Sequence, residues 1–139
     1  MLNIRWGHAV YWVFSMPVLR MKGHPYVRQI YGKVALQRGP FVYCLEEVDN
    51  GAGLYQLRLP IGSQFEVQPD DQLHAGLNVI HASGERWTAA EGWEEHLYRS
   101  DSRWIKESAP LKFIPYFTWA NRGLGEMSVW IEETLSEDV

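Results

Sequence analysis

Apolar and polar residues alternate along most of this chain, and this alternation restricts its fold more than any other feature. Residues 55–59 read Tyr-Gln-Leu-Arg-Leu, and the same period of two returns in residues 65–68 and 127–132. Successive side chains of a strand point to opposite faces, so this period indicates strands with one buried face. We therefore expect a chain that folds mainly as β-sheet.

Short stretches rich in Gly, Pro, Asn and Asp separate these strands, at residues 38–40, 49–51, 60–62, 69–71, 83–84 and 122–125. Many short strands with turn residues between them predict an all-β fold, an antiparallel β-sandwich of jelly-roll type. Helical patterning is weak. One candidate covers residues 88–97, where Thr88 and Glu91 match a capping box but Gly92 interrupts the segment. We therefore expect at most one short helix.

Two strand-length segments, residues 41–45 and 113–117, are apolar almost without interruption. Such runs are typical of strands that are covered on both faces. Pro115 lies inside the second run, and proline has no N–H to donate to a neighbouring strand. This proline predicts that its strand lies at a sheet edge or contains a bulge.

The length of 139 residues is enough for one hydrophobic core, and 46% of the residues are hydrophobic. We expect a single β-sandwich domain over residues 1–139. Within it, residues 1–22 form an N-terminal strand region left over from a preceding domain. Residues 133–139 form an acidic, solvated tail.

Charge and targeting features exclude two classes of partner. With 13 basic and 17 acidic side chains the net charge is −4, and the basic residues are dispersed, so no nucleic-acid partner is expected. No apolar run reaches the length of a membrane span, and the N-terminus lacks the basic region and cleavage site of a signal peptide. A lone cysteine also suits a reducing compartment, so we expect a cytoplasmic protein.

Candidate catalytic side chains are few. Cys44 has no His, Lys or Arg beside it in sequence to activate its thiol, which favours a buried structural cysteine. Glu46, Glu47 and Asp49 are an acidic cluster that has the residue types for glycoside chemistry or calcium binding. Their spacing does not follow a calcium loop, and acids before a turn usually mark a solvated strand end. We expect no catalytic residue here.

The histidines give no support to a metal or cofactor site. His8, His24, His74, His81 and His96 are scattered, without the close pairs that zinc sites use. The chain also lacks a nucleophile elbow, a phosphate-binding loop and a dinucleotide-binding motif. We therefore expect no metal and no cofactor.

Tryptophan marks the one segment where a ligand is worth testing. Trp87, Trp93 and Trp104 lie in residues 81–110, which are charged, interrupted and unlike the rest of the chain. We expect a long excursion over the sandwich. These rings either pack a loop onto the core or offer a face for a carbohydrate, and packing is the commoner role.

Four motifs resemble one known family. They are SMPVLRM at residues 15–21, GKVALQRGPFVYCLEEVDN at residues 32–50, LYR at residues 97–99 and KFIPYFTWANRGLGEMSVWI at residues 112–131. In content and order they resemble the C-terminal region of the bacterial β-L-arabinofuranosidases of glycoside hydrolase family 127. The resemblance extends over residues 12–132.

The resemblance implies a piece of a glycoside hydrolase and not a hydrolase. In that family a preceding (α/α)6 barrel holds the active site, with a zinc-bound cysteine nucleophile, and β-sandwich domains follow it. None of those roles carries over to this chain, because Cys44 lies in the sandwich motif. The resemblance thus implies a non-catalytic accessory domain that packs on the parent barrel or mediates a homodimer. A carbohydrate-binding module using the three tryptophans is the alternative, and a stand-alone hydrolase ranks last.

Overall fold

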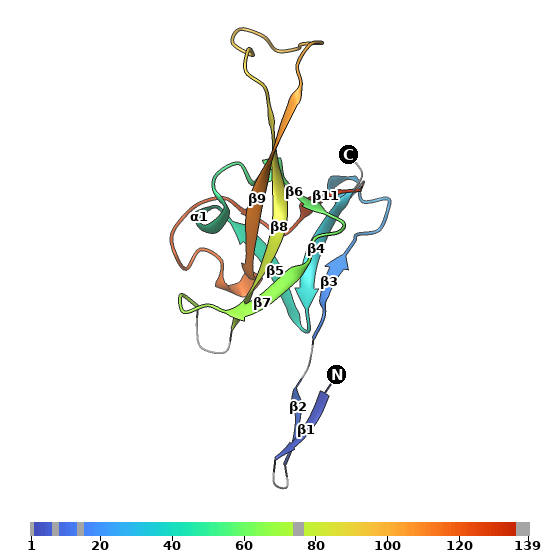
Figure 1. The fold of residues 1–139 in the computed structure, drawn as a ribbon, viewed down its shortest axis with the longest axis vertical. Helices are drawn as coiled ribbons and strands as arrows, with labels where there is room; N and C mark the ends of the chain where they lie inside the picture. The colour runs from blue at the N-terminus through green and yellow to red at the C-terminus, as the bar shows by residue number, and fades with distance from the viewer. Residues whose placement is uncertain (1, 7–8, 14–15, 74–76, 136–139) are drawn as a thin grey trace.

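The structure is a computed structural model that describes residues 2–6, 9–13, 16–73 and 77–135 (Figure 1). Its strands, in chain order, are β1 (Leu2–Trp6), β2 (Ala9–Val13), β3 (Val18–Met21), β4 (Lys33–Arg38), β5 (Phe41–Glu46), β6 (Leu57–Pro60), β7 (Phe65–Pro69), β8 (Asn78–Ala89), β9 (Trp104–Pro115), β10 (Met127–Ser128) and β11 (Ile131–Thr134). The helical elements are α1 (Glu47–Asn50) and three single 3-10 turns, η1 (Arg28–Ile30), η2 (Leu54–Gln56) and η3 (Tyr116–Thr118). The prediction of a mostly β chain with at most one short helix is confirmed.

The main sheet closes on itself. Its neighbours run β5–β9–β8–β6–β11–β4, and β4 pairs again with β5, which makes a ring of six strands. All pairings in the ring are antiparallel except that of β11 with β6. The strands β3, β7 and β10 extend the ring from outside. The sheet is therefore barrel-like, and the more specific prediction of a jelly-roll sandwich is not confirmed.

The hairpin between β4 and β5, one of the pairings that close the ring, is determined by its local sequence. Gln37 pairs with Val42 and Arg38 with Phe41, so Gly39 and Pro40 alone form the hairpin loop. Gly39 has a φ of 58°, in the left-handed region that glycine adopts without a Cβ penalty. A two-residue loop joins neighbouring antiparallel strands directly.

The interior of the ring is the main hydrophobic core. Its buried members alternate along each strand, as the period of two predicts, and they are Val34, Leu36, Tyr43, Leu45, Leu54, Leu57, Leu59, Ile80, Ala82, Leu111, Phe113 and Ile131. A second, smaller cluster of Cys44, Val79 and Ile114 lies on the outer face, where Leu73, Met127 and Val129 pack against it. The two apolar runs at residues 41–45 and 113–117 thus contribute to both clusters, because β5 and β9 are buried on both sides.

Two local predictions are wrong. Residues 88–97 are not a helix: Thr88 lies in β8, opposite Ile105 of β9, because these two strands continue their pairing far beyond the ring. Pro115 is the last residue of β9, which lies between β8 and β5 and is neither an edge strand nor bulged at this residue. A terminal position lets the strand tolerate the missing N–H.

The segment predicted as an excursion over the sheet is instead an arm. Beyond the ring, β8 and β9 stay paired as far as Ala89 and Trp104 and project away from the barrel (Figure 1).

At the N-terminus, β1 and β2 pair only with each other among the described strands. At the other end, residues 133–134 complete β11, while residues 136–139 of the predicted acidic tail lie outside the described residues. No helix among the described residues is long and apolar enough to cross a membrane.

Gly84 of β8 tests how closely the barrel wall is packed. A Cβ built at this buried glycine would collide with the Leu111 side chain and reach 3.0 Å from the Ala109 carbonyl oxygen. We expect Gly84→Val to lower the free energy of unfolding by about 1–3 kcal/mol through overpacking, measured by urea denaturation. Ser83→Val, at the exposed neighbouring position, is the control. Equal effects of the two changes would contradict this account.

Candidate functional site

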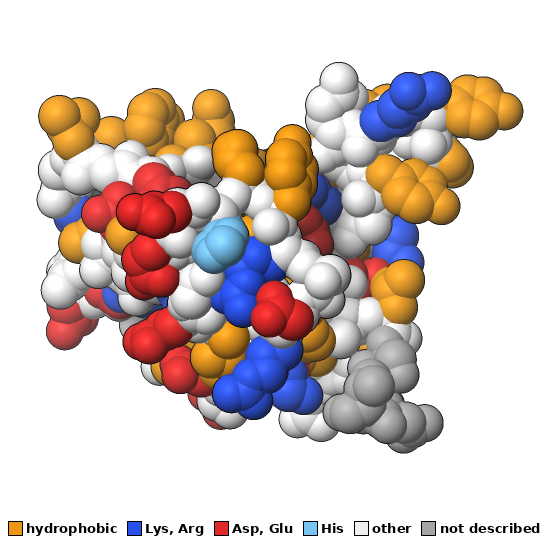
Figure 2. All heavy atoms as spheres, turned by 90° about the horizontal axis from the view of Figure 1, so that it is seen from above, with side chains coloured by type: hydrophobic (Ala, Val, Ile, Leu, Met, Phe, Trp, Pro, Cys, Tyr) orange, Lys and Arg blue, Asp and Glu red, His pale blue; other side chains and the backbone are white. Residues whose placement is uncertain are grey.

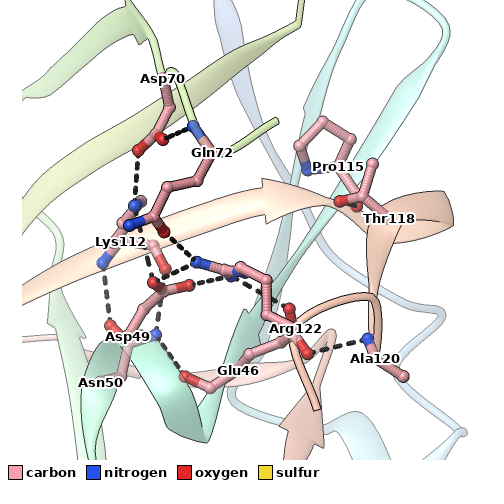
Figure 3. Close-up of polar contacts among 10 residues, drawn as sticks. All are labelled: Glu46, Asp49, Asn50, Asp70, Gln72, Lys112, Pro115, Thr118, Ala120 and Arg122. Atoms are coloured by element: carbon pink, nitrogen blue, oxygen red, sulfur yellow. Dashed lines mark hydrogen bonds and ion pairs between the residues drawn. The ribbon is translucent and has the colours of Figure 1, made fainter. Parts of the chain in front are cut away.

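Acidic and basic side chains meet over the outer cluster, where β5 ends and α1 begins (Figure 3). Arg122, from the loop after η3, donates from Nη1 to Asp49 Oδ1 at 2.7 Å and from Nη2 to Asp49 Oδ2 at 2.5 Å. Its Nη2 also donates to Glu46 Oε1 at 3.1 Å. Glu46 is only 5% exposed. The guanidinium therefore neutralises two carboxylates that the fold takes out of water.

Lys112 of β9 extends the network toward the β7–β8 connection. Its Nζ lies 2.6 Å from Asp70 Oδ2 and 3.6 Å from Asp49 Oδ1. Asn50 ties the same strand to α1: its Nδ2 donates to the Glu46 and Lys112 carbonyl oxygens, and its Oδ1 accepts from the Lys112 N–H. Every one of these groups has a charged or hydrogen-bonding partner.

The loop that carries Arg122 is held by backbone groups as well. The N–H of Ala120 donates to Glu46 Oε2 at 2.9 Å, and Ala120 has a φ of 67°, which turns the chain back toward α1. Gln72 Oε1 accepts from Arg122 Nη1 at 3.2 Å. Three segments far apart in the sequence, around residues 46–50, 70–72 and 118–122, are thereby joined at one point.

The ion pairs shift the pKa values of Arg122 and Asp70. Hydrogen bonds to Asp49, and then to Glu46, raise the pKa of Arg122 against the opposing effect of burial. The hydrogen bond from Lys112, followed by that from the Gln72 N–H, lowers the pKa of the Asp70 carboxyl. A carboxyl group whose pKa is lowered, as that of Asp70 is, is a poor general acid at neutral pH. The arrangement suits a structural role better than acid–base chemistry.

The structure therefore changes the interpretation of the acidic cluster. Glu46 and Asp49 are not in a solvated turn, because Arg122 and Lys112 pair with them. Glu47 is directed elsewhere, and its Oε1 accepts the Glu126 N–H at 3.1 Å. Neither Arg122 nor Lys112 is among the candidates predicted from the sequence, since both come from segments more than sixty residues away from Asp49.

Cys44 is the buried structural cysteine that the sequence predicts. It is completely buried in the outer cluster. Burial raises the pKa of its thiol to about 12, and the nearby charges of Glu46 and Asp49 raise it further than Arg122 lowers it. Because the thiolate is the nucleophilic form, this thiol has almost none of it at neutral pH.

The three tryptophans lie on the arm. Trp87 pairs with Lys106 and Trp104 with Ala89, so both rings are on the same face of the β8–β9 hairpin as diagonal neighbours. Trp104 is 66% exposed, whereas Trp87 is partly buried and donates from Nε1 to Glu85. Trp93 lies in the loop at the tip, with the Arg99 guanidinium 5.7 Å from its ring centroid. The structure thus brings two of the three together.

The histidines do not assemble a site in the described residues. His24, His81 and His96 belong to the β3–β4 connection, to β8 and to the arm loop, while His8 and His74 lie outside the described residues. Within the described ranges, no group of three or more His, Cys, Asp and Glu side chains has the arrangement to hold a metal ion.

The closed ring of strands in the described residues defines the fold class, a small barrel-like β domain. The family comparison gives the class its name: residues 18–132 match the glycoside hydrolase family 127 C-terminal domain. The chain belongs to this family.

The similar proteins are much longer than this chain, which matches only a small part of each. The chain is 35% identical over 119 residues to a non-reducing end β-L-arabinofuranosidase of Bifidobacterium longum subsp. longum, a match that covers 84% of this chain and 18% of the relative. A crystal structure of a family 127 β-L-arabinofuranosidase from Geobacillus stearothermophilus T6 matches with 48% identity and a TM-score of 0.76, covering 90% of this chain and 19% of that one. A family 127 β-arabinofuranosidase structure matches with 30% identity and a TM-score of 0.72, covering 87% and 18%. This chain spans about a fifth of their length.

Removing Arg122 tests whether the charge network stabilises the barrel. Arg122→Met keeps much of the side-chain volume but leaves Glu46 and Asp49 without their cation, so we expect a loss of about 3–5 kcal/mol in the free energy of unfolding. The triple change Arg122→Met, Glu46→Gln and Asp49→Asn removes the orphaned charges and should recover part of that loss. Urea denaturation measures both. If Arg122→Met costs no more than a surface substitution such as Arg103→Met, the network is not a stabilising element.

Proposed function

We propose that this chain is a non-catalytic accessory domain of a family 127 glycoside hydrolase and that it packs against the remainder of such an enzyme. The observation that carries the proposal is the use of its acids. Of the three acids with the residue type for glycoside chemistry, Glu46 and Asp49 are paired with Arg122, and Glu47 accepts the Glu126 N–H. Asp70 is paired with Lys112. Carboxylates committed in this way cannot serve as a nucleophile and an acid at a sugar ring.

The domain boundaries form part of the proposal. We place the accessory domain at the family match, residues 18–132. The N-terminal strand region within residues 1–22 includes β1 and β2, which pair only with each other among the described strands and are therefore proposed as part of a preceding domain. An isolated two-stranded hairpin has little stability in water, which supports this assignment. A single, buried, unpaired cysteine supports a cytoplasmic location.

Activity assays test the proposal. We expect the purified chain to release no 4-nitrophenol from 4-nitrophenyl β-L-arabinofuranoside, because Glu46 and Asp49 are paired with Arg122 and the Cys44 thiol is buried. Turnover that survives repurification and is lost in Glu46→Gln or in Cys44→Ala would contradict the proposal and establish the lowest-ranked alternative, a stand-alone hydrolase. The unfolding midpoint of each variant is the control for loss of fold.

A second candidate function rests on the shared face of Trp87 and Trp104. Two rings on one side of a projecting hairpin form a platform of the kind that stacks on sugar rings, and Trp93 at the tip adds a third. In this alternative the arm is a carbohydrate-binding surface of the accessory domain.

Fluorescence titration tests the carbohydrate alternative. If the arm binds sugars, arabinose-containing oligosaccharides at millimolar concentration will change the tryptophan emission, and Trp104→Ala will abolish the change. Tyr31→Ala, which removes a ring of similar exposure from the β3–β4 connection, is the matched control. An emission spectrum unaffected by the sugars removes the alternative.

A further inference from the structure

Asn50 and Gly51, at the end of α1, form the one Asn-Gly pair of the sequence. An asparagine followed by glycine loses its side-chain amide most readily, because glycine has no side chain to hinder attack by its backbone nitrogen. Both residues have a structural role. Gly51 has a φ of 82°, a positive value that favours glycine, and the Asn50 side chain joins α1 to β5 and β9. The fold therefore retains a chemically labile pair.

Loss of the amide begins at the backbone nitrogen of Gly51. This nitrogen gives up its proton and forms a bond to Cγ of Asn50, while the Cγ–Nδ2 bond breaks and the side-chain nitrogen takes up a proton and leaves as ammonia. The product is a cyclic imide. Water then opens the imide at the side-chain carbonyl to give aspartate, or at the backbone carbonyl to give isoaspartate. Gly51 is exposed to solvent, so burial does not prevent this reaction.

Hydrogen bonds occupy the groups that the reaction uses. The Gly51 N–H donates to the Glu47 carbonyl oxygen at 2.8 Å, which holds the proton that must be lost. Asn50 Nδ2 donates to the carbonyl oxygens of Glu46 at 2.9 Å and Lys112 at 3.0 Å, and Asn50 Oδ1 accepts the Lys112 N–H at 2.9 Å (Figure 3). The imide has neither the Gly51 N–H nor Nδ2, so three of these four bonds are lost when it forms.

The Arg122 network holds the same part of the chain closed. Asp49, the residue before Asn50, accepts hydrogen bonds from Arg122 and lies 3.6 Å from the Lys112 ammonium. An opening that frees Asn50 must separate α1 from β9. The free energy of a local opening is set by the contacts that it breaks, so removal of the Arg122 guanidinium makes this opening more frequent.

We propose that Asn50 is a site of spontaneous deamidation, which the folded chain suppresses and which reacts when the end of α1 opens from β9. This inference goes beyond the proposed function, because it concerns a covalent change of the domain and not what the domain packs on. The fraction of chains that carry the product then records how long they have been open.

An aspartate at position 50 does not fit the contacts that the asparagine makes. It has no N–H to donate, so its carboxylate faces the carbonyl oxygens of Glu46 and Lys112 without a proton between them. The carboxylate also adds a negative charge next to Asp49, in a chain whose net charge is already −4. Acidic side chains gather toward one side of the view in Figure 2. The deamidated chain is therefore less stable than the original.

An isoaspartate changes the main chain itself. Arg86 of β8 donates to the carbonyl oxygens of Asn50 at 2.8 Å, Ala52 at 2.9 Å and Gly53 at 3.1 Å. In isoaspartate the main chain runs through Cγ and gains one carbon ahead of Gly51, and the former backbone carbonyl becomes a carboxylate. The three carbonyl oxygens then no longer have the spacing that suits one guanidinium.

Peptide mapping by mass spectrometry tests the proposal on the full chain, kept folded or unfolded in guanidinium chloride at the same mildly alkaline pH. We expect Asn50 to react at least about tenfold more slowly in the folded chain. Asn121, which is exposed and followed by Arg122, is the internal control and should react far more slowly than Asn50 in the unfolded chain. Equal rates in folded and unfolded chains, or equal rates at the two asparagines in guanidinium chloride, would overturn the proposal.

Arginine variants test whether opening of α1 controls the reaction. Arg122→Met should accelerate deamidation of Asn50 at least about tenfold under native conditions, whereas Arg103→Met, at an exposed position, should leave the rate unchanged. Lys112→Met, which keeps the backbone groups bound to Asn50, is a milder variant in case Arg122→Met does not fold. If both network variants react no faster than Arg103→Met, the proposed opening is wrong.

A direct substitution tests the effect of the product. Asn50→Asp should raise the equilibrium constant of unfolding about tenfold, because it leaves two carbonyl oxygens without their donor. Asn121→Asp, the same chemical change at an exposed asparagine, is the matched control. Equal stabilities of these two variants in urea denaturation would contradict the structural role of the amide. None of these results alters the expected absence of glycosidase turnover, so the two proposals fail independently.

Discussion

The pairing of Arg122 with Glu46 and Asp49 fastens the loop that leads to the closing strands of the barrel against the end of β5. The loop that follows η3 must cross from the end of β9 to β10 and β11, and β11 then fills the position between β6 and β4. Arg122 holds that loop against the end of β5, and the Ala120 N–H bound to Glu46 fixes its turn. Without this anchor the loop would be held to α1 and β5 only by the contacts of Glu126 and the short pairing of β10.

Local sequence determines much of this fold, and distant pairing determines the rest. The alternation in residues 55–59 and the apolar runs of β5 and β9 are local signals, and each of them identifies a strand and its buried face. Ring closure through the parallel pair of β11 and β6 has no such signal, because the two strands are brought together by the chain between them. For the same reason the helix prediction for residues 88–97 fails: the long pairing of β8 with β9 overrides a weak local capping pattern.

In the candidate site, too, local sequence predicts some features and contacts between distant residues determine the others. Sequence identifies the acids of β5 and α1 as ionisable groups, and a strand end before Asn50 and Gly51 suggests exposure to water. Only the fold supplies their partners, because Arg122 is separated by 73 residues from Asp49 and by 76 residues from Glu46. A resemblance to a hydrolase family is thus compatible with acidic residues that act as structural ions. Arg122 lies in the motif at residues 112–131 that contributes to the family resemblance, and in this chain it contacts Glu46 and Asp49.

The position of β11 bears on how the chain is made. It is the last of the described strands, yet it lies between two strands that precede it by many residues, β4 and β6. During synthesis the ribosome releases the N-terminal strands first, so the apolar interior stays accessible to solvent until Thr134 has emerged. A nascent chain of this domain therefore cannot complete the ring of strands before β11 has been synthesised.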